Sequence, residues 1–140
     1  MWDAYFFKRF SPHEEPGTLI KLLGAALGLS KDQMVVTFQS RFGKAKWLEP
    51  YTEPTLVKLA AAGVKRVDVM CPGFVADCLE TLEEIAQEAR EAFIAAGGEG
   101  FSYVPCLNDA PAWISALGAL AQRHLSGWDT RAGPDAPALA

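Results

Sequence analysis

The sequence has few cysteines, an excess of acidic over basic residues and no long apolar run, and each shortage excludes a class of protein. Three cysteines without C-x-x-C spacing (Cys71, Cys78 and Cys106) indicate neither a disulfide framework nor a zinc site, and predict buried, reduced thiols. Thirteen Lys and Arg against 17 Asp and Glu leave a net charge of −4, which argues against a nucleic-acid partner. No apolar run approaches the roughly 20 residues of a transmembrane segment, and no signal-peptide pattern opens the chain. These observations favour a soluble, cytoplasmic protein.

The motifs of several common chemistries are also missing. The sequence has no G-x-G-x-x-G after an expected strand, no G-x-x-x-x-G-K-[ST] and no G-x-S-x-G. Dinucleotide, P-loop and serine-hydrolase functions therefore lack support, and a flavodoxin-like binding module lacks its phosphate-binding loop. The composition itself is that of an ordinary globular domain, with half of the 140 residues hydrophobic and 21% charged.

Expected strands and helices alternate along the chain. The expected strands are Ala4–Phe10, Met34–Phe38, Val67–Met70 and Phe101–Pro105, and the expected helices are Thr18–Leu27, Glu53–Ala62, an acidic helix between Pro72-Gly73 and Gly97-Gly98, and Pro111–Leu125. This order predicts an α/β fold, a three-layer sandwich around a four-stranded parallel sheet of Rossmann-like type. Residues 1–125 are expected to form the domain, and the Gly-, Pro- and Ala-rich residues 126–140 a disordered tail.

The acidic helix carries two patterns. An apolar stripe is expected to face the core and comprises Leu79, Leu82, Ile85, Ala86, Ala89 and Phe93. Asp77, Glu80 and Glu84 follow at i, i+3 and i+7, which places three carboxylates on a second face. They could simply complement the helix dipole and face water, with Asp77 as an N-cap. Alternatively, they lie at the carboxyl edge of a parallel sheet, where they could bind a metal ion or move protons.

In the expected fold, every loop after a strand opens on the same edge of the sheet. The loops at His13, at Gln39–Gly43, at Pro72–Asp77 and at Cys106–Asp109 should therefore converge. The sequence predicts the functional site at this edge.

Four strings, in this order and at these separations, carry a resemblance to a known family. They are QSRFG (Gln39–Gly43), WLEPYT (Trp47–Thr52), CPGFVADCLETLEEI (Cys71–Ile85) and PCLND (Pro105–Asp109). From about Thr18 to Leu125 the sequence resembles the C-terminal half of a bacterial ferrochelatase. The resemblance implies insertion of ferrous iron into protoporphyrin IX to form protohaem, without an organic cofactor. It also implies two Rossmann-like domains with the porphyrin in the cleft between them.

The resemblance nominates site residues one by one. Glu80 matches the family's glutamate after the P-G-F-V-A-D loop, and Asp77 and Glu84 match further acidic residues proposed to pass metal or protons. Phe10–Pro16 matches F-S-x-H-x-x-P, which nominates His13 as catalytic and metal-binding, although a loop histidine without this role is the alternative. Trp47 matches a tryptophan near the macrocycle, and Gln39 and Ser40 are assigned to substrate binding.

The implied residues suit the implied reaction. Two pyrrole N–H protons must leave as the metal enters, so a histidine can serve as the base. Carboxylate oxygens can hold iron loosely enough to release it. A rigid cleft with aromatic walls could hold the macrocycle bent, with its nitrogen lone pairs exposed to the metal.

The chain also departs from the family. Its members are more than twice as long, and the N-terminal domain that closes the porphyrin cleft is not in this sequence. The alternative function is therefore a folded fragment that is inactive alone or binds porphyrin or metal weakly. Self-association, or pairing with a separate N-terminal half, would cover the surface left open. Because no cysteine follows Cys106, we expect no iron–sulfur cluster.

Overall fold

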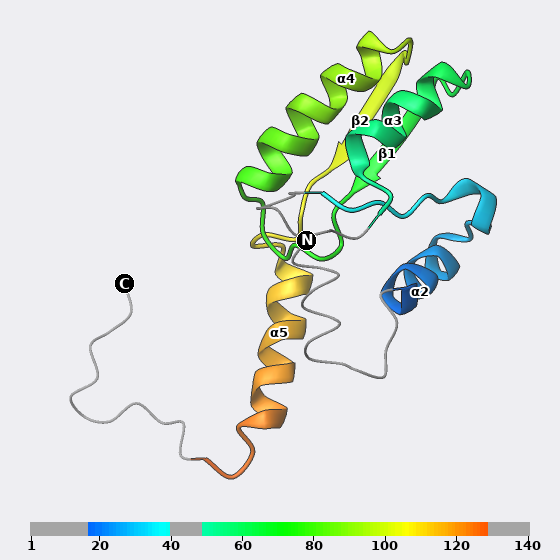
Figure 1. Ribbon diagram of the computed structural model, residues 1–140. Coiled ribbons are helices and arrows are strands. Elements are labelled where there is room, and N and C mark those ends of the chain that lie inside the picture. Colours follow the sequence, from blue (N-terminus) through cyan, green and yellow to red (C-terminus); the bar gives the residue numbers. More distant parts are fainter. Residues whose placement is uncertain (1–16, 40–48, 129–140) are drawn as a thin grey trace. The chain divides into compact units, whose positions relative to one another are not determined.

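A computed structural model of the chain describes residues 17–39 and 49–128. It divides into two compact units, residues 1–108 and 109–140, each of which is considered by itself. The first unit contains α2 (Gly17–Leu27), η1 (Lys31–Gln33), α3 (Thr52–Ala61), β1 (Arg66–Met70), η2 (Glu80–Ala89), α4 (Arg90–Ala95) and β2 (Gly100–Val104) (Figure 1). The second unit contains α5 (Pro111–His124). Among the described residues, no helix combines the length and the apolar character that a membrane crossing requires.

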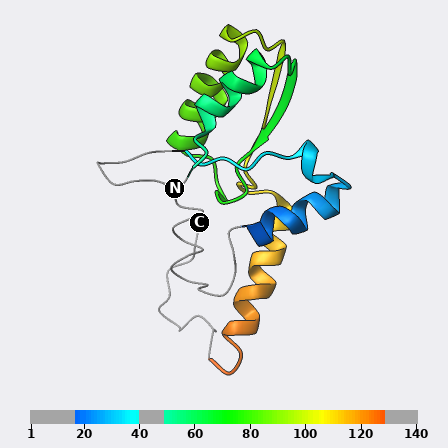
Figure 2. The same ribbon diagram turned by 45° about the vertical axis from the view of Figure 1, so that its right-hand side comes forward.

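The two strands form a parallel pair joined through the helix that η2 and α4 make together. Val67 lies opposite Phe101, and Val69 lies opposite Tyr103. These four side chains are half-buried because they pack against the apolar core. Figures 1 and 2 show α3 and α4 on one face of the pair. The opposite face carries alternate residues, all of them exposed: Arg66, Asp68, Met70, Ser102 and Val104. The predicted mixed α/β class with a parallel sheet is confirmed.

The sheet of the described residues is smaller than predicted. The expected strand Ala4–Phe10 lies outside the described residues. In the expected strand Met34–Phe38, only Phe38 pairs, through a parallel bridge to Tyr51. The Phe38 N–H donates to the Pro50 carbonyl at 2.9 Å, and the Thr52 N–H donates to the Phe38 carbonyl at 3.0 Å. Four strands and three layers are therefore not confirmed, since the ladder seen among the described residues joins β1 and β2.

The helix ends follow the sequence closely. α2 ends before Gly28, whose φ is +69°, and α3 ends two residues before Gly63, whose φ is +94°. These left-handed conformations strain a residue with a Cβ atom, so glycine favours them. The predicted helices at Thr18–Leu27, Glu53–Ala62 and Pro111–Leu125 are confirmed to within one residue at each end.

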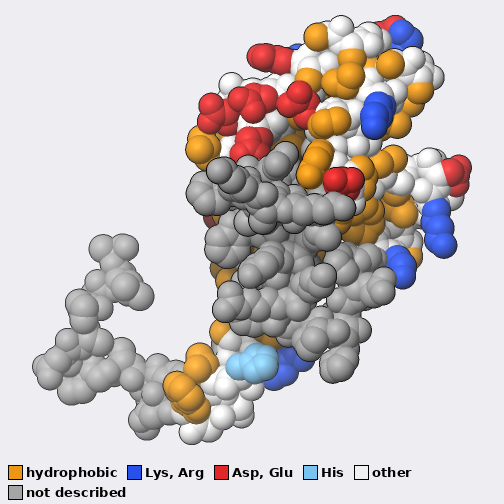
Figure 3. Space-filling view, viewed as in Figure 1, with side chains coloured by type: hydrophobic (Ala, Val, Ile, Leu, Met, Phe, Trp, Pro, Cys, Tyr) orange, Lys and Arg blue, Asp and Glu red, His pale blue; other side chains and the backbone are white. Residues whose placement is uncertain are grey.

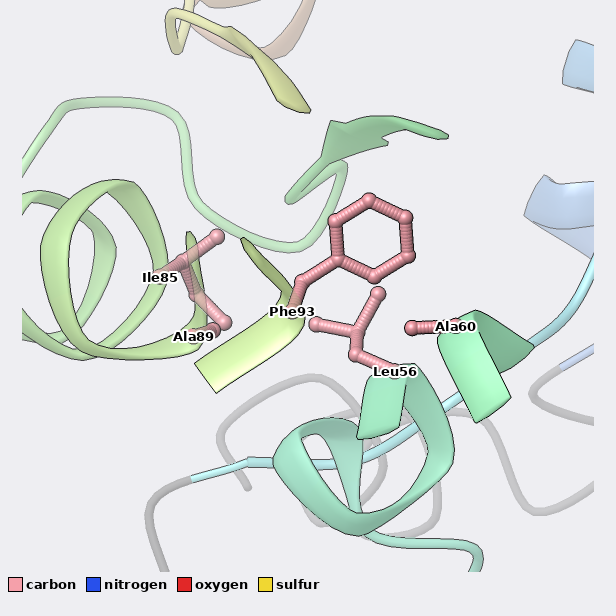
Figure 4. Packing of buried hydrophobic residues seen from close by; sticks show 5 residues of the cluster. All are labelled: Leu56, Ala60, Ile85, Ala89 and Phe93. Carbon is pink, nitrogen blue, oxygen red and sulfur yellow. The ribbon is translucent and has the colours of Figure 1, made fainter. Parts of the chain in front are cut away.

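The core lies between α3 and the η2–α4 helix. Five side chains form it: Leu56, Ala60, Ile85, Ala89 and Phe93 (Figure 4). Phe93 is fully buried, and its ring lies 6.2 Å from the ring of Phe101, tilted by 54°. This aromatic contact fastens the helix to β2.

The acidic helix is wider than an α-helix over its first ten residues. η2 is a π-helix, in which hydrogen bonds close over five residues instead of four. Its buried residues, continued into α4, are spaced by four throughout: Thr81, Ile85, Ala89 and Phe93. The predicted stripe is wrong at Leu79 and Leu82, which are 69% and 47% exposed.

Gly98 follows the carboxyl end of α4, and its backbone lies against the buried ring of Phe93. A Cβ atom at this position would lie 2.2 Å from Cε1 of Phe93, far inside van der Waals contact. The Gly98 N–H also donates to the Phe93 carbonyl at 3.0 Å. Glycine is required here because the backbone touches a buried ring, and not because of its φ angle.

Candidate functional site

The loops that follow β1 and β2 meet at the carboxyl ends of the two strands. The backbone N–H of Asp77 donates to Oδ1 of Asn108 at 2.8 Å, and the Asn108 N–H donates to the Val75 carbonyl at 2.9 Å. The predicted convergence is confirmed for these two loops. The loop at His13 and most of the loop after Gln39 lie outside the described residues.

The Asp77 carboxylate is the centre of a hydrogen-bond network. Its Oδ1 accepts from the Tyr103 hydroxyl at 2.5 Å and from the Cys106 N–H at 3.3 Å. Its Oδ2 accepts from Nδ2 of Asn108 at 2.7 Å. These hydrogen bonds, led by those from Asn108 and Tyr103, hold the pKa of Asp77 well below its ordinary value. Asp77 is therefore an ionised acceptor and does not serve as the N-cap of the helix.

Thr81 links this network to the first turn of the helix. Its hydroxyl accepts from the Cys78 N–H at 3.0 Å, and it lies 3.2 Å from Oδ1 of Asp77 and 3.1 Å from the Cys78 carbonyl. Its single proton can go to either acceptor. Thr81 is fully buried, so these bonds replace water that the hydroxyl has lost.

Sequence reasoning missed Thr81, Tyr103 and Asn108. Tyr103 had a usable signal, since it alternates with Phe101 on β2 and a tyrosine facing a core needs a partner for its hydroxyl. Asn108 has a φ of +48°, a conformation that asparagine tolerates better than most residues. Thr81 had no such signal, because the predicted apolar stripe included Leu79 and Leu82 and left Thr81 out.

Glu80 lies at the start of η2 and is half-buried. Hydrogen bonding from the Cys78 thiol and from the backbone lowers the pKa of Glu80. Burial raises the pKa of Cys78, so the thiol keeps the proton that it donates. Nε2 of Gln39 donates to the Glu80 carbonyl at 2.9 Å. The structure thus brings together Gln39 and Glu80, two residues that the sequence assigned to one site.

Glu84 follows Glu80 on η2 and is also half-buried. Figure 3 shows acidic side chains gathered over this helix. Asp77, in contrast, lies before the helix, with its carboxylate held in the loop network. Among residues 17–39 and 49–128, no group of three His, Cys, Asp or Glu side chains could hold a metal ion. The predicted metal set of His13, Asp77, Glu80 and Glu84 stays a prediction.

The remaining predicted site residues fall outside the description. His13, Ser40 and Trp47 lie in segments that the structure does not describe. The three cysteines form no disulfide and are half-buried, where buried thiols were predicted. Burial also raises the pKa of Cys106, so this thiol is protonated near neutral pH.

Comparison with known proteins supplies the family. The sequence profile named Ferrochelatase matches residues 13–125. A ferrochelatase from Methylibium petroleiphilum is 65% identical over 127 residues, which are 91% of this chain and 35% of the relative. One from Polaromonas is 62% identical over the same shares, and one from Bordetella pertussis is 66% identical over 110 residues, 79% of this chain and 30% of the relative.

No solved structure matches the chain. The chain spans about a third of the length of the curated relatives that it matches. Because the family profile covers most of its residues, and because these relatives are about two-thirds identical to it, the chain belongs to the ferrochelatase family.

Proposed function

We propose that this chain takes part in the insertion of ferrous iron into protoporphyrin IX to form protohaem, with Glu80 as the anionic group that the metal meets. The observation that carries this proposal is the state of Glu80. Glu80 follows the loop at the carboxyl end of β1, its carbonyl accepts from Gln39 at 2.9 Å, and its pKa is lowered from the ordinary value. Open α/β sheets bind their ligands at the carboxyl ends of their strands. Family membership points to the same reaction.

The proposed roles follow from the balance of the reaction. Iron enters as Fe²⁺ and two pyrrole protons leave, so the porphyrin becomes a dianion that holds the metal without any change of oxidation state. Glu80, with Glu84 as a second carboxylate, offers oxygen ligands that hold a divalent ion weakly. His13 is proposed as the base that accepts a pyrrole proton, since its ordinary pKa lies near neutral pH.

Substrate binding is proposed for Gln39, Ser40 and Trp47. The support is the hydrogen bond from Gln39 to the Glu80 carbonyl, because it places the start of the QSRFG string beside the acidic helix. Trp47, in the next string, would offer an aromatic face to the flat macrocycle.

A larger sheet is also proposed for the intact fold. Met70 and Val104 are 38% and 37% exposed on the open face of the strand pair, and Val35 and Val36 are 55% and 40% exposed. Apolar side chains at these positions suit two further strands and a second layer of helices. The four-stranded, three-layer arrangement would bury them.

Partners and location are proposals too. Leu79 and Leu82 are exposed on the acidic helix and would be covered by self-association or by a separate N-terminal half. Size-exclusion chromatography showing a clean monomer would remove self-association. Three cysteines that form no disulfide are compatible with a cytoplasmic location. Ferrous iron is proposed as a substrate, with no organic cofactor and no iron–sulfur cluster.

The test is zinc insertion into a soluble porphyrin, followed by fluorescence, with the 140-residue chain. We expect Glu80→Gln to lower the rate about 100-fold or more, a typical effect of losing a group that acts in proton transfer or charge stabilisation. Glu88→Gln, an exposed position on the same helix, is the matched control and should keep the wild-type rate.

Two results would overturn the proposal. One is a Glu80→Gln variant as fast as the wild type. The other is a chain that circular dichroism shows to be folded and that inserts no metal. In the second case, an absorbance titration with porphyrin would decide whether the chain is the weak porphyrin-binding module that is the alternative function.

A further inference from the structure

We propose that Asp77 is a positioning residue and not a carrier of metal or protons: its carboxylate fastens the loop after β1 to the end of β2 and thereby sets the place of Glu80. This inference rests on the proposed function only for the role of Glu80. Its structural part, the fastening of two loops, stands on the hydrogen bonds alone. Of the three acidic residues Asp77, Glu80 and Glu84, Asp77 would then position the loops, and Glu80 and Glu84 would bind the metal ion.

Oδ1 of Asp77 is already occupied by hydrogen-bond donors. Tyr103, Thr81 and Cys106 offer three donors within 3.3 Å of Oδ1, and Asn108 offers one at 2.7 Å from Oδ2. A carboxylate has about four lone-pair sites in all. Both lone-pair sites of Oδ1 are therefore filled, so a metal ion could bind this oxygen only by displacing a donor. Oδ2 keeps one lone-pair site beside its hydrogen bond from Asn108.

The hydrogen bonds of Asp77 and Asn108 also join the backbone of the loop after β1 to the loop after β2. Asn108 gives its Nδ2 to the Asp77 carboxylate and takes the Asp77 N–H on its Oδ1. The same Nδ2 lies 3.2 Å from the Cys106 carbonyl. This reciprocal pairing joins residues 31 positions apart in the chain, so the loop after β1 cannot move without breaking bonds to the loop after β2.

Hydrogen bonds also link Asp77 to the first turn of η2, where Glu80 lies. The Thr81 hydroxyl joins Asp77 to the Cys78 N–H. Glu80 lies between Cys78 and Thr81 in the chain, at the start of η2. Loss of the Asp77 contacts should therefore loosen the first turn of η2, to which Glu80 belongs.

The chemistry of the donors makes the charge of Asp77 essential. An asparagine has the same shape, but its NH₂ group would meet either Nδ2 of Asn108 or the donors around Oδ1. Two donors then face each other without an acceptor. Tyr103→Phe removes a single hydroxyl and keeps the carboxylate, so the two variants separate the charge from its partner.

The structural test is amide hydrogen exchange of the 140-residue chain. We follow the amides of Asp77, Cys78 and Cys106, whose acceptors belong to the network. Asp77→Asn and Tyr103→Phe should each speed their exchange about tenfold or more, as expected for the loss of a hydrogen bond to a charged group. The Gly98 amide, at the other end of the helix, should be unchanged.

Two matched controls accompany these variants. Asp68→Asn changes an exposed aspartate on β1, and Tyr51→Phe removes a hydroxyl for which no hydrogen bond is seen among the described residues. Neither should change the exchange of the three amides. The double variant Asp77→Asn/Tyr103→Phe should have a smaller effect than the product of the two single effects, because both break the same bond.

The functional test separates positioning from carrying. In calorimetric titrations with zinc alone, Asp77→Asn and Tyr103→Phe should bind like the wild type, and Glu80→Gln should bind more weakly. In the insertion assay, Tyr103→Phe should slow the wild type but should not slow Glu80→Gln any further. A merely structural role would lower both rates alike.

The inference is overturned if Asp77→Asn weakens zinc binding as Glu80→Gln does while amide exchange stays at the wild-type rate. It is also overturned if Tyr103→Phe, which frees the carboxylate, tightens zinc binding. A wild-type chain that neither binds zinc nor inserts it contradicts the proposed function instead. The exchange experiment then still decides whether Asp77 fastens the two loops.

Discussion

The two ends of the η2–α4 helix are held in place by different physics. At the carboxyl end, the buried ring of Phe93 packs against Phe101 and lies where a side chain at residue 98 would be. At the amino end, the leucines are exposed, and the carboxylate of Asp77 holds the turn through directed bonds. Shape fixes one end and hydrogen bonds fix the other. A site that must admit a ligand fits the second end, because it keeps polar groups at a partly open edge.

The largest expected change in the free energy of unfolding concerns the carboxyl end of the η2–α4 helix, where Phe93 packs; we call this the packed end. Phe93→Ala should destabilise the chain by about 3–5 kcal/mol, since it removes a fully buried ring and leaves a cavity. Urea unfolding followed by circular dichroism measures the change. Ile94→Ala, at a neighbouring side chain that is 38% exposed, should have a much smaller effect. Equal effects would show that this end is not held by packing.

Gly98→Ala tests the same contact by changing the residue that touches the Phe93 ring. The added methyl group would overlap the Phe93 ring, so we expect a loss of about 1–3 kcal/mol, the usual range for overpacking. Gly118→Ala is the control, because a Cβ atom there meets no other atom within 4 Å. Combining Gly98→Ala with Phe93→Leu should recover part of the loss if the overlap is its cause.

Local signals in the sequence predicted the helices, and interactions between distant residues limited the rest. Gly28 and Gly63 mark helix ends by chemistry that depends only on neighbouring residues. Thr81 is fully buried and Leu82 is 47% exposed, whereas the predicted apolar stripe included Leu82 and not Thr81. The segment Met34–Phe38 has the composition of a strand, but within the described part of the chain only its last residue forms a β-bridge, to Tyr51.

The candidate site was predictable in place but only partly in its chemistry. The convergence of the loops after β1 and β2 follows from the alternation of strands and helices. The sequence row of Asp77, Glu80 and Glu84 gave no indication that the first member would bind Tyr103 and Asn108. Those partners lie 26 and 31 positions away, and no periodicity connects them.

Lowering the pH should first weaken the hydrogen bonds of Asp77 at the amino end of the η2–α4 helix. The pKa of Asp77 in the folded chain is below its ordinary value of 3.8, so its stabilising contribution is complete above that value. It is lost as the pH falls from there towards the lower folded-state pKa. Urea unfolding between about pH 6 and pH 2 measures this acid limb. Asp77→Asn should flatten it and Asp68→Asn should not; an acid limb that Asp77→Asn leaves unchanged contradicts the assignment.

The smallest effect is expected at an ion pair near the packed end. Nζ of Lys65 lies 3.0 Å from the Glu99 carboxylate, with the two side chains 56% and 67% exposed. Water and salt screen such a pair, so Lys65→Met should change the free energy of unfolding by less than about 1 kcal/mol. Added salt should shrink the difference further. A larger loss would mean that charge also holds the packed end.

The measurement that tests the account most directly is zinc insertion by Glu80→Gln and Asp77→Asn, with urea unfolding of the same samples. The account predicts that Glu80→Gln loses the activity but keeps the wild-type stability. It predicts that Asp77→Asn loses stability and frees its network amides to exchange. In the reverse pattern, Glu80→Gln unfolds more easily, and Asp77→Asn keeps its stability but loses insertion. That result would contradict the positioning role of Asp77 and the metal-binding role of Glu80.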